Sequence, residues 1–159
     1  MIIYNNLKIK EKHKNNIVAI GNFDGIHLGH QKVLKQAKIK SKKEGLPFGL
    51  ITFEPMPVMF FNSKVKNHRI NQLNQKINQL KKFKLDFLVV VKFNKKFSLL
   101  SAEYFIKKII KDKIQSKYIF VSKNFRYGKN RKGNIKLIKN YEKKLRYKTI
   151  ITSPLKGLK

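Results

Sequence analysis

The sequence predicts an α/β fold in which a parallel β-sheet carries helices on both faces. Short apolar runs alternate with longer segments whose apolar residues recur at helical spacing. This alternation is typical of parallel strands joined by crossover helices. The runs are mostly apolar, as expected for strands that are covered on both faces. The chain has 159 residues, enough for one domain with a core of its own.

Five short apolar runs predict the strands of this sheet. They are rich in Ile, Val and Phe, residue types that favour strands. The first run stops at Gly21, and the last lies close to the end of the sequence. The predicted strands occupy residues 17–20, 48–53, 86–92, 118–121 and 147–152.

The first helix is expected over residues 29–43. Val33, Leu34 and Ala37 fall on one face of such a helix. Gly45 stands just beyond it, where helices commonly end on a residue in the left-handed conformation.

Three further helices and two loops complete the predicted order. Ser101 is a suitable N-cap for the second of these helices, and two prolines make residues 54–68 a loop. A polar, basic stretch with two glycines makes residues 122–134 a second loop. The apolar residues that mark the three helices are Leu73, Ile77 and Leu80; Ala102, Phe105, Ile106, Ile109 and Ile110; and Ile138, Tyr141 and Leu145.

The formal net charge of +30 is unusual for a chain of this size. Such a charge attracts polyanions, above all nucleic acid. Most of the basic residues are Lys, however, and they are spread along the whole chain, whereas surfaces that grip phosphate tend to use Arg forks. We therefore expect no specific nucleic-acid partner, and a basic nucleic-acid-binding protein remains the alternative from another class. Arginine occurs only at Arg69, Arg126, Arg131 and Arg146.

The sequence gives no sign of a disulfide-rich, membrane-spanning or secreted protein. The chain has no cysteine, so neither a disulfide framework nor a thiolate metal site is expected. No apolar run approaches the roughly 20 residues that span a bilayer. The first residues lack the apolar core and cleavage site of a signal peptide. We expect a cytoplasmic protein without a membrane partner.

The segment that follows the first predicted strand carries the clearest chemical signal. Residues 21–30 read Gly-Asn-Phe-Asp-Gly-Ile-His-Leu-Gly-His. Its three glycines let the backbone turn sharply and approach a phosphate closely. Free N–H groups and a partial positive charge come from the helix that begins here. Because ligands of open parallel sheets bind at the carboxyl ends of the strands, this segment predicts a triphosphate site.

Two histidines of this segment are the candidate catalytic residues. His27 and His30 are three residues apart, so they share one face of the entering helical turn. Paired imidazoles there can donate hydrogen bonds to the oxygens of a phosphoryl-type transition state. Metal ligation is the alternative, but no third ligand stands at a telling spacing. His13 and His68 have no such context and are expected on the surface.

The run at residues 20–31 resembles the signature of the bacterial FAD synthetases. These are the N-terminal adenylyltransferase modules of bifunctional riboflavin kinase/FMN adenylyltransferases, in the nucleotidyltransferase superfamily. The resemblance covers nearly the whole chain and implies one Rossmann-like domain over residues 1–159. The further blocks that carry it are residues 52–57 (Thr-Phe-Glu-Pro-Met-Pro), 86–91, Phe93, 101–105, 124–128 (Asn-Phe-Arg-Tyr-Gly) and 131–134.

What the resemblance implies is AMP transfer from ATP to FMN, which yields FAD and pyrophosphate and uses Mg²⁺ with ATP. His27 and His30 would contact the ATP phosphates and stabilise the transition state. The rest of the ATP side would be Gly21, Asn22, Phe23, Asp24 and Gly25. The FMN side would be Thr52, Pro55, Pro57, Phe61 and Asn124.

Two kinds of side chain are chemically suited to contact FMN, independently of the family resemblance. Phe60 and Phe61 could wall a flat ring, with ordinary packing as the alternative. Arg126 could meet the FMN phosphate, with a solvated loop as the alternative.

The sequence departs from the family pattern in three places. Met56 stands where the family usually has His, and Ser122 where it usually has Gly. The sequence ends at Lys159, before a Ser-Ser-Thr-x-x-Arg element that grips ATP phosphates in the family, and no riboflavin kinase module follows. We therefore expect a module truncated at its C-terminus, without kinase activity and with adenylyl transfer weakened or lost. The alternatives are an adenylyl- or cytidylyltransferase with another acceptor and a catalytically dead remnant.

Overall fold

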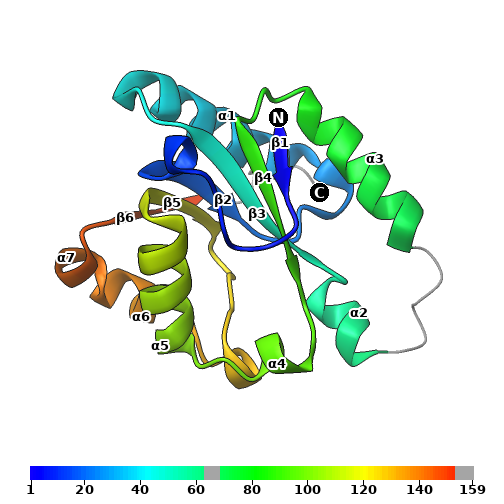
Figure 1. The fold of residues 1–159 in the computed structure, drawn as a ribbon, viewed down its shortest axis with the longest axis vertical. Helices are drawn as coiled ribbons and strands as arrows, with labels where there is room; N and C mark the ends of the chain where they lie inside the picture. Colours follow the sequence, from blue (N-terminus) through cyan, green and yellow to red (C-terminus); the bar gives the residue numbers. More distant parts are fainter. Residues whose placement is uncertain (63–68, 153–159) are drawn as a thin grey trace.

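A six-stranded parallel sheet forms the centre of the molecule (Figure 1). The computed structural model describes residues 1–62 and 69–152. Within them the strand order is β1-β4-β3-β2-β5-β6, and each pairing is parallel. The strands are β1 (Ile2–Tyr4), β2 (Asn16–Ile20), β3 (Phe48–Glu54), β4 (Phe87–Lys92), β5 (Ser116–Ser122) and β6 (Lys148–Thr152). The predicted α/β class is confirmed.

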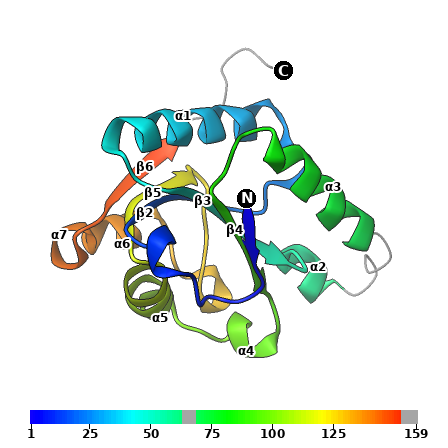
Figure 2. The ribbon, with the colours of Figure 1, turned by 45° about the horizontal axis from the view of Figure 1, so that its top comes forward.

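Helices cover both faces of the sheet (Figure 2). One face carries α1 (Leu28–Glu44) and α3 (Arg69–Lys81). The other face carries α5 (Ala102–Tyr104), which continues as the π-helix η4 (Phe105–Ile114), together with α6 (Ile135–Asn140) and α7 (Glu142–Leu145).

Two apolar clusters, one on each face, form the core. Leu34 of α1 and Leu80 of α3 pack in the same cluster as Ile17 of β2. The next residue, Val18, packs in the other cluster with Ile110 of η4. Because successive side chains of a strand point to opposite faces, strands buried on both faces need apolar residues throughout.

The strand order reverses at β2. From β2 the chain moves outward through β3 to β4 on one side, and it then returns to place β5 on the other side of β2. Open parallel sheets bind ligands at such a switch point, outside the carboxyl ends of the strands. The segment at residues 21–27 leaves β2 at this point.

β1 was not predicted from the sequence. It has three residues and pairs with the outer edge of β4, with Ile2 opposite Phe87. Three residues are too few for a periodic pattern to appear in the sequence. The strand forms through its hydrogen bonds with β4.

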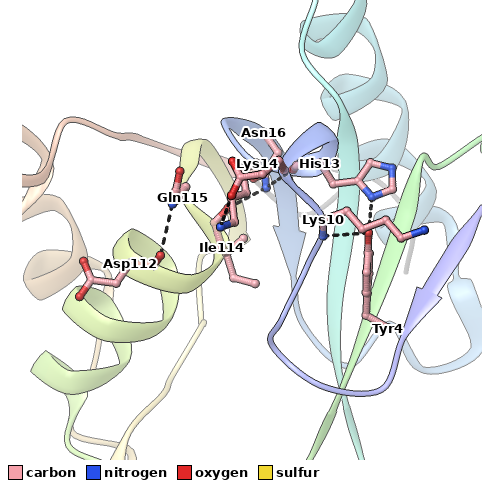
Figure 3. A network of polar contacts seen from close by, with 9 residues as sticks. Tyr4, Lys10, His13, Lys14, Asn16, Asp112, Ile114 and Gln115 are labelled. Carbon is pink, nitrogen blue, oxygen red and sulfur yellow. Dashed lines mark hydrogen bonds and ion pairs between the residues drawn. The ribbon is translucent and has the colours of Figure 1, made fainter.

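His13 is buried, so the prediction of a surface position was wrong. It belongs to a polar network that joins β1 to the start of β2 and the end of η4 (Figure 3). The Tyr4 hydroxyl lies 2.6 Å from His13 Nδ1, and the His13 ring stacks on Phe87 at 5.0 Å between centroids. The Asn16 side-chain amide donates to the carbonyls of His13 at 2.8 Å and Ile114 at 3.0 Å. Burial lowers the pKa of His13, and the charge of Lys12 adds to this. His68 lies outside the described residues.

Several predicted helix ends are confirmed. Gly45 ends α1 in the left-handed conformation at φ 67°. The Ser101 hydroxyl accepts from the amide of Tyr104 at 3.1 Å and caps α5. No helix within the described ranges is long and apolar enough to span a membrane.

Two predicted segments are divided differently in the structure, and one short helix was not predicted. The expected loop at residues 54–68 contains α2 (Pro57–Phe61), because proline suits the first turn of a helix. The last predicted helix is split at Tyr141 into α6 and α7. A short α4 (Lys95–Ser98), capped by the Asn94 side chain, was not predicted.

Candidate functional site

The loop between β2 and α1 is tightly wound. Phe23, Gly25 and Ile26 have φ values of 50°, 71° and 45°, in a region where a β-branched residue such as Ile26 is strained. The side chains of Phe23 and Ile26 are buried, while Asn22 and Asp24 are exposed. The apolar side chains thus anchor the loop, and the side chains of Asn22 and Asp24 are exposed.

His27 and His30 meet at the start of α1, as their spacing predicts. Their rings stack with centroids 3.6 Å apart, and the His30 ring also lies 4.9 Å from that of Phe23. Gly29 makes this possible, because a Cβ there would lie 3.1 Å from the His27 ring. His27 is the N-cap of α1 and makes no side-chain capping bond. The first amide groups of α1, which have no partner within the helix, therefore lie beside the two imidazoles.

The environment of His30 keeps its ring neutral at pH 7. Burial lowers the pKa of His30 to about 4, and the neighbouring His27 contributes to the decrease. His30 Nδ1 is buried and has no partner among the described residues. Buried polar atoms are usually paired, so this unpaired nitrogen marks an unsatisfied polar position beside the loop.

Thr52 and Lys76 lie under the loop. Thr52 is fully buried, and its hydroxyl donates to the Asn22 carbonyl at 3.1 Å. Lys76 Nζ donates to the same carbonyl at 2.6 Å. Lys76 was not a predicted site residue, although a signal was present: with Leu73, Ile77 and Leu80 it completes the spacing of a buried helical stripe.

Aromatic rings gather where β3 and β4 end. Phe61 is 71% exposed and contacts Phe60 and Phe93 edge-on, at 5.1 and 6.0 Å between centroids. It follows Pro57, the first residue of α2. Pro55 lies between β3 and α2 and is partly exposed. We name these rings the aromatic cluster: Phe53, Phe60, Phe61, Phe93 and Phe97.

The segment after β5 is a loop, as predicted, and it is well packed. Phe125 and Tyr127 are buried and stack at 5.2 Å, whereas Asn124 and Arg126 point outward and are exposed. The Tyr127 hydroxyl donates to the Asn134 carbonyl at 2.9 Å, and burial raises its pKa. The packed rings therefore hold Asn124 and Arg126 at the carboxyl end of β5, the neighbour of β2.

A protein-only metal cage is absent from residues 1–62 and 69–152. No group of three or more His, Asp or Glu side chains there could hold an ion. Within these ranges the histidine pair has no third ligand of the kind that a metal centre needs.

Comparison with known proteins shows which family of nucleotidyltransferases the chain resembles. Residues 9–158 match the family model described as FAD synthetase. The chain belongs to the FAD synthetase family. This confirms the resemblance carried by residues 20–31.

Curated relatives of the FAD synthetase family support the assignment. A bifunctional riboflavin kinase/FMN adenylyltransferase of Buchnera aphidicola (subspecies Schizaphis graminum) is 42% identical over 147 residues, which are 92% of this chain and 47% of the relative. The protein of the same description from Bacillus subtilis is 38% identical over 80% of this chain and 40% of its own length. The Escherichia coli K12 protein is 31% identical over 77% of this chain and 39% of its own length. The chain thus spans about half the length of these FAD synthetase relatives or less.

One solved structure superposes on nearly the whole of this chain and shares its fold. A Streptococcus pneumoniae chain described as a macrolide-efflux protein superposes with a TM-score of 0.80 at 26% identity, over 99% of this chain and 52% of that one.

Proposed function

We propose that this chain transfers AMP from ATP to FMN in the cytoplasm and so produces FAD and pyrophosphate. The observation that carries the proposal is the stacked His27–His30 pair at the start of α1, beside the switch point of the sheet. The names of the relatives include FMN adenylyltransferase activity, and residues 20–31 carry the run that resembles the signature of that family. We propose that the loop and the histidine pair carry the transfer itself.

The reaction needs no nucleophile from the protein. An oxygen of the FMN phosphate attacks the α-phosphorus of ATP, a new P–O–P bond forms, and the bond to the β-phosphate breaks to release pyrophosphate. Catalysis of this kind consists of positioning and of charge stabilisation.

The ATP side consists of the β2–α1 loop and the start of α1. Gly21, Asn22 and Asp24 line the outward face of the loop, and Phe23 and Gly25 shape its left-handed turns. The triphosphate would lie at the start of α1, where N–H groups and the helix dipole favour anions. The neutral His30 and the exposed His27 would donate hydrogen bonds to phosphate oxygens as charge moves onto the leaving pyrophosphate.

We propose that Mg²⁺ enters as part of the ATP substrate. The absence of an acidic cluster in residues 1–62 and 69–152 suits an ion that is held mainly by phosphate oxygens, as Mg²⁺ often is. The ion would neutralise charge on the triphosphate.

The FMN side lies next to the ATP side, between α2 and the loop after β5. Phe61, Pro55 and Pro57 would border the flat flavin ring, backed by the aromatic cluster. Asn124 and Arg126 face outward from the neighbouring loop and would meet polar groups and the phosphate of FMN. Thr52, which is fully buried, would act on the site through the Asn22 carbonyl.

Binding of FMN separates this proposal from the nucleic-acid alternative. Added chain is expected to quench FMN fluorescence to saturation, because the ring stacks on aromatic side chains. The affinity for FMN should fall less than about tenfold between 50 and 200 mM salt, since few charges meet one phosphate, whereas a surface contacting 6–10 phosphates loses about 10³–10⁵. A folded chain that leaves FMN fluorescence unchanged and binds duplex DNA with the steeper salt dependence would contradict the proposal.

A further inference from the structure

Lys76 is buried in a way that lysines rarely are. It lies on α3, the helix that packs beside the β2–α1 loop, and only 6% of it is exposed. Burial of an ammonium group costs free energy unless the group is paired. The described part of the molecule offers it a specific set of partners, which suggests a defined role.

Among the described residues, two groups accept hydrogen bonds from Lys76. Lys76 Nζ donates to the Asn22 carbonyl at 2.6 Å and to Thr52 Oγ1 at 3.3 Å. The Thr52 hydroxyl uses its own proton to reach the Asn22 carbonyl at 3.1 Å. We name Lys76 and Thr52 the loop brace, because both donate to one carbonyl of the loop. The brace links α3 and β3 to the segment that follows β2.

The carbonyl held by the loop brace stands at the start of the strained turn. Phe23 follows Asn22 at φ 50°, and Ile26 has φ 45°. Strained backbone of this kind persists only where surrounding groups hold it. At the far end of the turn the side-chain amide of Gln31 donates to the Ile26 carbonyl at 3.2 Å. The turn is therefore fixed at both ends, and the end nearer the sheet depends on Lys76.

The ammonium also acts through its charge. Burial lowers the pKa of Lys76, while Glu54 and Asp24 oppose that decrease. The charge of Lys76 is in turn one of the causes that lower the pKa of His30. Lys76 is thus within electrostatic range of the histidine pair and places positive charge behind the expected triphosphate.

We propose that Lys76 is a positioning residue of the ATP side: its ammonium holds the Asn22 carbonyl and so fixes the loop that leads into the histidine pair. The inference rests on the proposed function, because it names ATP as the ligand that benefits. Lys76 acts through the loop and touches neither substrate.

Replacement of Lys76 with Met tests this role. Lys76→Met keeps the apolar stem and removes the donors and the charge. Because the variant loses hydrogen bonds from a charged donor, we expect ATP to bind at least about tenfold more weakly and FMN to bind within about twofold of wild type. Isothermal titration with a non-hydrolysable ATP analogue and FMN fluorescence quenching measure the two affinities.

Two controls isolate the ammonium. Lys81→Met makes the same change at an exposed position of the same helix and should alter neither affinity.

Because the chain has no cysteine, Lys76→Cys can be alkylated in denaturant at one site and refolded. Bromoethylamine restores an ammonium at nearly the original distance and should restore ATP affinity, whereas iodoacetamide adds a neutral amide and should not. Wild-type chain taken through the same steps corrects for losses in refolding.

Amide hydrogen exchange gives a readout that does not depend on ATP. In Lys76→Met, exchange at residues 22–25 should be faster, while the buried amides of β4 keep their protection. Unchanged ATP affinity and unchanged exchange in a folded variant would overturn the proposal. Equal losses of ATP and FMN affinity, with faster exchange throughout, would also overturn it in favour of a purely structural role. If wild type bound no ATP, the proposed function would fail, and exchange at residues 22–25 would still decide what Lys76 does.

Discussion

Replacing His27 with Ala is expected to lower kcat for FAD formation by about 10²–10³, the usual cost of removing one donor that stabilises a transition state. His27 is exposed, and its ring rests on His30 and over Gly29 rather than in the core. Its removal should therefore leave the fold and the FMN affinity nearly unchanged. Steady-state kinetics at saturating ATP and FMN, with thermal unfolding measured in parallel, provide the comparison.

A neighbouring surface residue is the control for His27. Lys35→Ala alters an exposed position on the same helix, where alanine also favours the helix, and should leave kcat within about twofold. If His27→Ala turned over as fast as wild type, the histidine pair would not be the catalytic centre. If it lost FMN binding and turnover together, His27 would be a residue of the flavin side.

Gly128→Ala is expected to destabilise the protein by about 2–5 kcal/mol and to weaken FMN binding. Gly128 has φ 77°, and a Cβ there would lie 2.7 Å from the backbone of Ala102. The left-handed conformation costs alanine about 1–2 kcal/mol, and overpacking against groups that cannot move adds about 1–3 kcal/mol. The clash would displace the loop that carries Asn124 and Arg126, so FMN affinity should fall as well.

Gly45→Ala separates the two causes. Gly45 has a similar φ of 67°, but nothing lies within 4 Å of an added Cβ, so this variant should lose only the conformational part, about 1–2 kcal/mol. Urea unfolding gives both free energies, and fluorescence quenching gives FMN affinity. Equal losses in the two variants would show that the contact between Gly128 and Ala102 is not tight, and the loop would then not be held as described.

Much of the fold could be predicted because its determinants are local. Strands buried on both faces appear as continuous apolar runs, and the end of α1 is marked by Gly45. The missed features depend on contacts between distant segments. β1 is too short to show a pattern, and His13 is buried only because Tyr4 and Phe87 come to it from β1 and β4.

The part of the candidate site that lies in residues 21–30 could be predicted from the sequence. The loop and its two histidines occupy ten consecutive residues, so their pairing follows from spacing. The loop brace joins Thr52 of β3 and Lys76 of α3 to Asn22, and only the folded chain brings them together. A lysine on a helix is normally interpreted as solvent-exposed, and that general rule concealed Lys76 despite its place in the apolar stripe.

The most direct test of the account is to incubate the purified chain with FMN, ATP and Mg²⁺ and to measure FAD and pyrophosphate. With ATP labelled at the α-phosphorus, the label should appear in FAD, pyrophosphate should form in equal amount, and both products should depend on His27. A folded chain that binds FMN and ATP but forms neither product would contradict the claim that it transfers AMP to FMN.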